Sequence, residues 1–299
     1  MSSAATFIAA DDFSALSPID EGEQLRLDVR RGAGPVVTVI LNAAIFSLTP
    51  VQSGQVVQSF STNRKMGYVF VKDMIDQVQP TLGTTMASFR NQGVQELVID
   101  MRYNGGGFVS VGRDVASYAA GSRGASQTFA RLLYNDQNAG SNFSYAFTNP
   151  NAWAGFSRVY VLMGERTCSA SEQVINGLRG VGVDVVAIGD TTCGKPVGFN
   201  ARDDGCGTTY SIVNFESVNA RNEGRYFDGF APTCSVAEDF SRPIGALDDP
   251  LLVAAAYHVD NGACPAGTAR EQALAKPTST SRKRYDGADG GERTGMQAR

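Results

Sequence analysis

Apolar and polar residues alternate strictly near the start of the chain, which is the spacing expected of a half-buried strand. In Gln24–Val29 (QLRLDV), every second residue is apolar. A turn with Gly and Pro, Arg30–Pro35, separates this segment from a second apolar run, Pro35–Leu41 (PVVTVIL). The two runs predict a β-hairpin, which is too small to be stable without a partner surface.

From Met66 onward, apolar runs typical of buried strands alternate with segments that have helical spacing. The expected strands are Gly67–Val71, Val94–Met101, Val159–Met163 and Val183–Ile188. The expected helices are Val71–Ser88 with an interruption near Pro80, Val109–Ala120, Ser169–Leu178 and Asp249–Val259. This alternation predicts an α/β domain with substantial parallel pairing.

The remaining segments have weaker patterns. Residues 1–20 show no clear period, and residues 50–64 are expected to be a linker or an irregular strand. Residues 198–234 are rich in Gly, Asp and Asn and predict hairpins and loops. From Lys276 onward apolar residues nearly vanish, which predicts a disordered tail.

Charge and hydropathy exclude some classes of protein. The chain carries 26 Lys+Arg against 30 Asp+Glu, a net charge of -4. It therefore has no basic excess with which to neutralise a phosphate backbone, and we expect no nucleic-acid partner. No stretch reaches the ~18 apolar residues of a membrane span. The N-terminus has no basic region and is not a signal peptide as it stands. The protein is therefore cytoplasmic, or the chain lacks its natural start.

Five cysteines lie in the second half of the chain. They form no CxxC pair, and His258 is the only histidine, so we do not expect a structural zinc site. Two interpretations stay open. The cysteines are buried small apolar residues, or they form one or two disulfides in an exported protein. Their spacing does not decide between them.

Three consecutive glycines, Gly105–Gly107, follow the expected strand that ends at Met101. Glycines allow backbone conformations that other residues resist, and they expose N–H groups near the start of the next helix. Such a turn donates hydrogen bonds to an oxyanion or a phosphate. The segment matches neither GxxxxGK[ST] nor GxGxxG. A tight turn without a ligand is the alternative.

A second polar turn, Thr167–Glu172, lies between an expected strand and helix. Ser169 suits a nucleophile there, because the N–H of Ala170 lies at a helix start where amide donors have no partner. That amide would stabilise a tetrahedral oxyanion. Ser-x-x-Glu is also a capping box, and the local pattern alone favours the cap.

A serine nucleophile needs a base. His258 lies in an expected C-terminal helix, where a packing or surface role is more common. Lys195 follows the strand Val183–Ile188, so it is expected at the same sheet edge as Ser169. A lysine serves as a base if burial lowers its pKa toward neutrality. Most lysines are solvated surface charges, so the hypothesis depends on the combination of glycine turn, serine and lysine.

The segments GYVFV, LVIDMRYNGGG, CSASE and IGDTTCGKPVG closely resemble the tail-specific or C-terminal processing serine peptidases, from about Met66 to Cys264. The resemblance implies a crotonase/ClpP-like α/β core, commonly preceded by a PDZ domain. Residues 20–45 resemble only the closing strands of a PDZ domain. The implied organisation is a partial PDZ-like segment and linker at 1–50, a peptidase core at 51–270 and a disordered tail at 271–299.

Carried over by motif, the resemblance implies that Ser169 is the nucleophile and Lys195 the general base. The N–H groups of Ala170 and Gly106 would form the oxyanion hole. The implied reaction is the hydrolysis of peptide bonds in unstructured or C-terminal segments of polypeptide substrates through an acyl-enzyme. This chemistry needs no metal and no cofactor. Oligomeric state does not follow from the resemblance.

The sequence departs from the family pattern at one informative position. Members often carry a glutamine four residues after the lysine, and here that residue is Phe199. Asp100 and Arg102 match positions that shape the glycine turn, and we interpret both as structural. Because family members are usually exported, the resemblance also implies a periplasmic or extracellular location. A longer precursor that is anchored in a membrane is one version of this expectation.

Two other functions remain as alternatives. The Phe199 departure and the incomplete PDZ segment favour a catalytically silent peptide-binding or scaffold protein of the same fold. A crotonase-like core would also suit an acyl-CoA hydratase or thioesterase. The Ser169 and Lys195 motifs argue against both of these activities.

Overall fold

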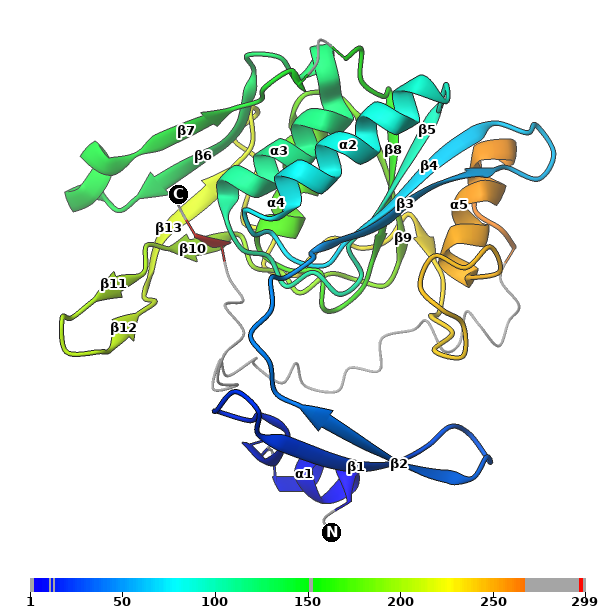
Figure 1. Cartoon of the computed structure of the whole chain (residues 1–299). Helices are drawn as coiled ribbons and strands as arrows, with labels where there is room; N and C mark the ends of the chain where they lie inside the picture. Colours follow the sequence, from blue (N-terminus) through cyan, green and yellow to red (C-terminus); the bar gives the residue numbers. More distant parts are fainter. Residues whose placement is uncertain (1–2, 11, 13, 151–152, 267–295, 298–299) are drawn as a thin grey trace. The chain divides into compact units, whose positions relative to one another are not determined.

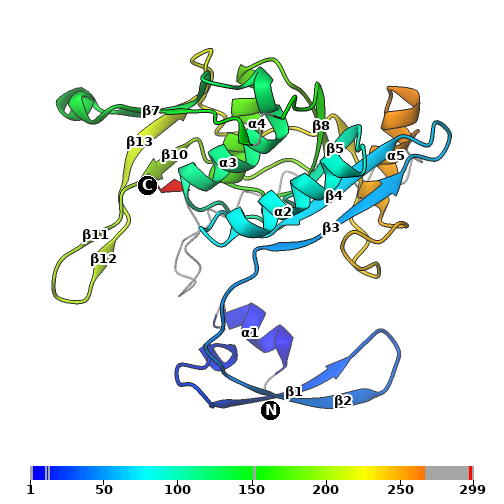
Figure 2. The same ribbon diagram turned by 45° about the horizontal axis from the view of Figure 1, so that its top comes forward.

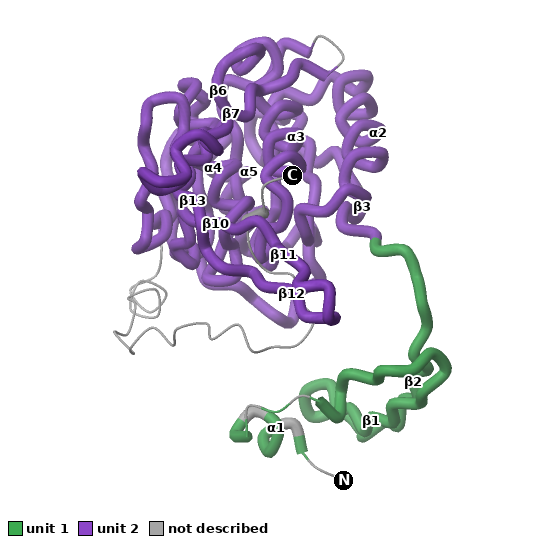
Figure 3. Tube along the Cα trace, turned by 90° about the vertical axis from the view of Figure 1, so that its left-hand side faces the viewer, with its two compact units in different colours: residues 1–48 green, residues 49–299 purple. Residues whose placement is uncertain are grey.

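The computed structural model describes residues 3–10, 12, 14–150, 153–266 and 296–297 of the 299-residue chain. The chain divides into two compact units, residues 1–48 and residues 49–299 (Figure 3). No helix in the described part of the chain is long and apolar enough to span a bilayer.

The first unit contains the expected hairpin. Strands β1 (Gln24–Arg30) and β2 (Val36–Asn42) pair antiparallel, with Leu25 opposite Leu41 and Leu27 opposite Val39. Alternation therefore places these residues on one face of the hairpin, whereas Val36 and Ile40 lie on the other face. A short helix, α1 (Ala4–Ala10), and a 3-10 turn (Ser14–Leu16) precede it, and the sequence pattern did not indicate either.

The second unit is built on a six-stranded sheet with the order β14-β9-β8-β5-β4-β3. All neighbours pair parallel except β3, which pairs antiparallel with β4 at the edge. The strands are β3 (Val51–Gln58), β4 (Lys65–Val71), β5 (Glu96–Asp100), β8 (Arg158–Met163), β9 (Asp184–Gly189) and β14 (Cys234–Ser235). The predicted parallel α/β sheet is confirmed, and the expected linker at 50–64 contains its edge strand.

Helices cover both faces of this sheet, which explains why the central strands are continuously apolar (Figure 1, Figure 2). Leu97 and Ile99 of β5 face the core beneath three helices, whereas Val98 between them faces the core beneath the fourth. The helices of the first face are α2 (Val78–Asn91), α3 (Val109–Ala120) and α4 (Ala170–Gly180), and α5 (Pro250–Asn261) covers the second.

The start of α2 corrects one prediction. The expected helix Val71–Ser88 begins at Val78 and continues to Asn91. Pro80 lies in the first turn, where its missing N–H has no helical partner to lose, so it does not interrupt the helix. The expected helix Val109–Ala120 has the predicted bounds.

A second sheet lies against α4, through the shared core residues Phe129, Leu132 and Phe215. Its order is β15-β10-β13-β6-β7, and β11 and β12 form a separate two-stranded hairpin. The sequence pattern indicated hairpins after residue 198 but did not indicate β6 or β7. The strands are β6 (Thr128–Tyr134), β7 (Phe143–Ala146), β10 (Val197–Phe199), β11 (Arg202–Asp203), β12 (Thr209–Tyr210), β13 (Val213–Val218) and β15 (Met296–Gln297), with 3-10 turns at Gly121–Arg123 and Asp136–Ser141.

The expected disordered tail, 271–299, lies outside the described residues except for β15. Gly198 of β10 pairs in parallel with Met296 of that strand.

Four of the five cysteines form disulfides, Cys168–Cys193 and Cys234–Cys264, and Cys206 is a free, exposed thiol. Of the two interpretations left open by the sequence, the structure selects the disulfides. They close loops of 25 and 30 residues.

Candidate active site

Three turns meet at one edge of the six-stranded sheet. They follow the carboxyl ends of β5, β8 and β9, which lie side by side because their strands are parallel neighbours. The Cys168 N–H donates to the Asn104 carbonyl at 3.0 Å, and the Cys193 N–H donates to the Thr167 carbonyl at 3.1 Å. The structure thus brings together the glycine turn (Gly105–Gly107), the serine turn (Thr167–Glu172) and the lysine loop (residues 190–196).

Ser169 lies between β8 and α4 in a backbone conformation that L residues rarely adopt, with φ +60° and ψ −116°. Its side chain is fully buried, and its Oγ has no hydrogen-bond partner among the described residues. A strained residue with an unpaired buried hydroxyl is costly to keep, so the position indicates function rather than stability. As in the predicted capping box, the Ser169 N–H donates to Glu172 Oε2 at 2.9 Å.

Gly106 packs directly on Ser169. At its φ of +107°, a Cβ on Gly106 would lie 2.8 Å from Ser169 Cβ and 3.1 Å from the Ala170 nitrogen. Only glycine permits this approach. Ala170 is the first residue of α4, so its N–H has no partner within the helix and faces this contact.

Asn104 is a residue of the candidate site whose contact with Gly106 the motif analysis missed. Its side chain is buried, and its Oδ1 accepts the Gly106 N–H at 2.9 Å. Its Nδ2 donates to the Val71 carbonyl at 2.9 Å. The Gly106 N–H is therefore satisfied within the turn, and it would bind an oxyanion only after Asn104 releases it. An asparagine directly before the three glycines was the available signal.

Glu172 links the serine turn to the lysine loop. Its carboxylate is fully buried and accepts the backbone N–H groups of Ser169, Gly194 and Lys195 at 2.8–2.9 Å, and the Thr192 hydroxyl at 2.6 Å. Burial raises the pKa of Glu172, and these hydrogen bonds oppose that rise. The sequence pattern identified this residue only as a helix cap.

Lys195 is half-buried on the loop that Glu172 anchors. Burial lowers the pKa of its ammonium group, against the opposing charge of Glu172. Its Nζ lies 5.5 Å from the centre of the Phe199 ring, a cation–π contact. Within the described residues, Lys195 makes no hydrogen bond to Ser169 Oγ. Phe199, the residue that departs from the family pattern, thus contacts the lysine itself.

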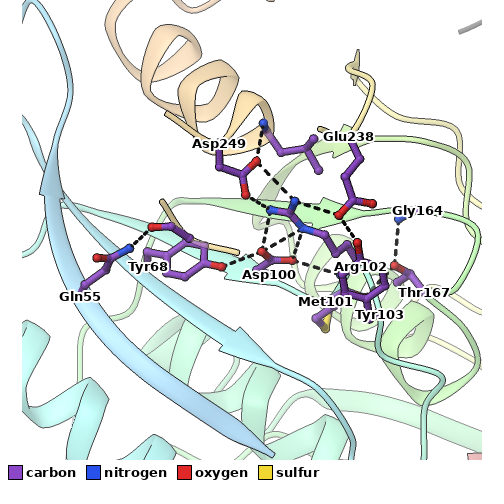
Figure 4. Close-up of polar contacts among 12 residues, drawn as sticks. Gln55, Tyr68, Asp100, Met101, Arg102, Tyr103, Gly164, Thr167, Glu238 and Asp249 are labelled. Carbon is purple, nitrogen blue, oxygen red and sulfur yellow. Dashed lines mark hydrogen bonds and ion pairs between the residues drawn. The ribbon is translucent and has the colours of Figure 1, made fainter. Parts of the chain in front are cut away.

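Asp100, the last residue of β5, and Arg102 form a buried ionic network (Figure 4). Arg102 contacts Asp100 at 2.8 Å and Asp249 at 2.7 Å, and Tyr68 donates to Asp100 at 2.7 Å. Burial raises the pKa of Asp100, while the Arg102 charge opposes this rise. Because Asp249 is the N-cap of α5, the network joins the turn to the helix on the far face of the sheet.

His258 lies on that same helix, α5, rather than with the three turns. It is buried, and its Nδ1 lies 3.3 Å from the Tyr160 hydroxyl. Burial lowers its pKa. The histidine therefore packs beneath α5, in the role that the sequence predicted.

Comparisons with known proteins identify the family of this chain and solved structures with a similar fold. The profile of peptidase family S41 matches residues 65–235, which is more than half of the chain. A Bacteroides fragilis protein assigned to the S41 proteases is 27% identical, with a TM-score of 0.67 over 80% of this chain and 65% of that one. No curated protein matches.

The photosystem II D1 C-terminal processing protease shares the fold, with 18% identity and a TM-score of 0.57 over 84% of this chain and 64% of that one. The chain thus spans a little less than two thirds of the length of these two solved structures.

Proposed function

The chain belongs to peptidase family S41, and from this premise we propose that it is a serine-type endopeptidase with Ser169 as nucleophile and Lys195 as general base. The observation that carries the proposal is the environment of Ser169. A buried, unpaired hydroxyl at positive φ lies against a glycine turn and the first amide of α4. A role in stability does not explain an unpaired buried hydroxyl, whereas acyl transfer needs a nucleophile that is free to attack beside amide donors for the oxyanion.

The reaction follows from these groups. Neutral Lys195 takes the proton of Ser169 Oγ as the oxygen attacks the carbonyl carbon of a peptide bond. The Ala170 N–H and the Gly106 N–H hold the oxyanion that forms, after the Asn104 side chain has released Gly106. The protonated lysine then donates its proton to the leaving amine, and an ester to Ser169 remains. Water, deprotonated by Lys195, hydrolyses this ester.

The described conformation is a resting one under this proposal. Ser169 is fully buried and lacks a hydrogen bond to Lys195, whose Nζ lies over Phe199. Substrate binding must therefore uncover the hydroxyl and move the ammonium group toward it. Hydrogen bonds of this kind commonly tighten only when the substrate is bound.

For the substrate, we propose unstructured or C-terminal segments of proteins, because an extended chain is needed to reach a hydroxyl that lies beneath a turn. The two disulfides support an oxidising compartment, periplasmic or extracellular. The neighbouring D1 processing protease is named for C-terminal cleavage, which supports the second substrate class.

The test is the hydrolysis of an unstructured fluorogenic polypeptide, together with labelling by a fluorophosphonate probe. We expect Ser169→Ala to abolish both while the thermal unfolding transition is kept. Ser241→Ala, at an exposed serine in the loop before α5, is the matched control and should retain both. Turnover by Ser169→Ala at the rate of the parent would refute the proposal.

A catalytically silent peptide-binding protein is the second candidate, because the Gly106 N–H is occupied and Ser169 lacks a bond to Lys195. This candidate predicts that the parent chain binds the polypeptide with no turnover and no labelling of Ser169. The same two assays therefore separate the candidates.

A further inference from the structure

The disulfide between Cys168 and Cys193 joins the two segments that carry the proposed nucleophile and base. Cys168 immediately precedes Ser169, and Cys193 lies two residues before Lys195. Their Cα atoms are 5.2 Å apart, although 25 positions separate them in the sequence. It is the covalent link between the serine turn and the lysine loop.

The backbone around this disulfide also contacts the glycine turn. Cys168 donates its N–H to Asn104, and Cys193 donates its N–H to Thr167. The position that a Cβ of Gly106 would occupy lies 3.0 Å from the Cys168 carbonyl oxygen. The glycine turn, the serine turn and the lysine loop therefore all meet near this bond. A shift of Cys168 would disturb its contact with Asn104, and a shift of Cys193 would disturb its contact with Thr167.

Backbone hydrogen bonds to neighbouring segments hold the lysine loop, since the Thr192 N–H donates to the Phe230 carbonyl at 3.2 Å and the Ser217 N–H donates to the Pro196 carbonyl at 2.8 Å. Glu172 holds the backbone of Gly194 and Lys195, and the Lys195 side chain contacts Phe199. Within the described residues, the ammonium group has no carboxylate within salt-bridge distance. The position of Lys195 is therefore set by its backbone, which is held by Glu172, by these backbone hydrogen bonds and by the disulfide.

We propose that the Cys168–Cys193 disulfide is a positioning element of the active site, and that its reduction by a dithiol lowers peptidase activity reversibly. This inference rests on the proposed function. Both cysteines are half-buried, so a small reductant reaches the bond without unfolding the protein.

The chemistry is thiol–disulfide exchange. A thiolate of the dithiol attacks one sulfur, the Cys168–Cys193 bond breaks, and a mixed disulfide forms. The second thiol then closes the reductant into its own disulfide and leaves two cysteine thiols. A disulfide oxidant reverses both steps.

The second disulfide, Cys234–Cys264, is a matched control, because it closes a loop of similar length. It joins β14, which pairs with the end of β9, to the segment after α5, and it links neither the serine turn nor the lysine loop. We would carry Cys206→Ser in every protein, because the exposed thiol of Cys206 would otherwise exchange with either disulfide.

The experiment compares this parent with Cys168→Ala/Cys193→Ala and with Cys234→Ala/Cys264→Ala, each with and without dithiothreitol. We expect dithiothreitol to lower kcat of the parent at least tenfold, and reoxidation to restore it. The Cys234/Cys264 variant should be as active as the parent before treatment and should lose activity to the same extent when dithiothreitol is added. The Cys168/Cys193 variant should be slow from the start and indifferent to dithiothreitol.

A readout of position separates this role from a loss of stability. If the lysine loop loosens, water reaches Lys195 and its pKa returns toward the ordinary value, so the rising limb of the kcat/KM pH profile should shift to higher pH. A kcat of the Cys168/Cys193 variant within twofold of the parent would overturn the proposal. The proposal would also be overturned if activity were lost on removal of Cys234–Cys264 and not on removal of Cys168–Cys193.

Hydrogen exchange tests the same proposal without catalysis. In the Ser169→Ala protein, reduction should speed exchange at the amides of Gly194 and Lys195, which donate to Glu172, but not at the amides of β8. Unchanged exchange at Gly194 and Lys195 would overturn the positioning role. An oxidised parent without activity or labelling would instead refute the proposed function, and this exchange result would still decide the role of the disulfide.

Discussion

The carboxylate of Glu172 accepts the backbone N–H of Lys195 at 2.8 Å, so one buried acid on α4 sets the position of the loop that carries the proposed base. The same Oε2 atom accepts the N–H of Ser169 at 2.9 Å. Both proposed reacting residues are thus held by one oxygen. This relationship makes Glu172 the residue whose loss should affect both segments together.

Glu172→Ala should lower kcat by at least tenfold and destabilise the fold by about 1–3 kcal/mol, since buried N–H groups would lose their acceptor. Glu172→Gln keeps one acceptor oxygen and should show a smaller effect on both. The measurements are steady-state kinetics and urea unfolding. Equal activity of the parent and Glu172→Ala would show that the loop keeps its position without this carboxylate.

The pH profile should follow the state of Lys195. Burial lowers its pKa from the ordinary value of 10.5, and only the neutral amine accepts a proton, so kcat/KM should rise with pH through that lowered pKa. Lys195→Arg should be inactive at every pH up to 10, because a guanidinium keeps its proton. A pH-independent rate between pH 6 and pH 10 would exclude Lys195 as the base.

Phe199→Leu tests the contact between the ring and the ammonium group. The substitution keeps an apolar neighbour but removes the π face that favours the charged lysine, a contact worth about 0.5–2 kcal/mol. The Lys195 pKa should fall further, and the rising limb of kcat/KM should move to lower pH. A shift to higher pH would mean that the ring acts mainly by excluding water.

Gly106→Ala should lower kcat by about 100-fold, because the new Cβ would lie 2.8 Å from Ser169 Cβ. Gly207→Ala is the matched control. Gly207 also has a positive φ, +91°, but no atom lies within 4 Å of the added Cβ. It should cost only about 1 kcal/mol of backbone strain and leave kcat unchanged. Equal losses in the two variants would assign the effect to strain alone.

Arg102→Met should destabilise the second unit by about 3–5 kcal/mol at pH 7, because Asp100 and Asp249 would remain buried without a partner charge. The loss should shrink at low pH, because burial raises the pKa of Asp100 and the protonated carboxyl group needs no partner charge. Urea unfolding at pH 7 and pH 4 measures the difference. An equal loss at both pH values would indicate packing rather than charge.

Local pattern was sufficient for much of this protein. The helix Val109–Ala120 was predicted with its bounds, because its apolar spacing is a property of consecutive residues. The parallel strands followed from their continuous apolar runs. Motifs at strand ends also placed Ser169 and Lys195 at a common edge, since the carboxyl ends of parallel strands meet there.

Contacts between distant residues needed the tertiary structure. The pairing of Cys168 with Cys193 depends on where two loops approach in space, and spacing along the chain carries no record of that approach. The role of Glu172 was hidden for the same reason, because a helix-cap pattern accounts for its bond to Ser169 but not for its bond to Lys195.

The sequence by itself determined the class of fold, the family and the residues available for chemistry, because periodicity and short motifs are local. Only the tertiary structure decided which amides are free and which are occupied. The Gly106 N–H is held by Asn104, and the Ser169 hydroxyl is left without a partner. Those outcomes depend on how three separate turns pack, because the partner of a buried polar group is set by its neighbours in space and not by its neighbours in sequence.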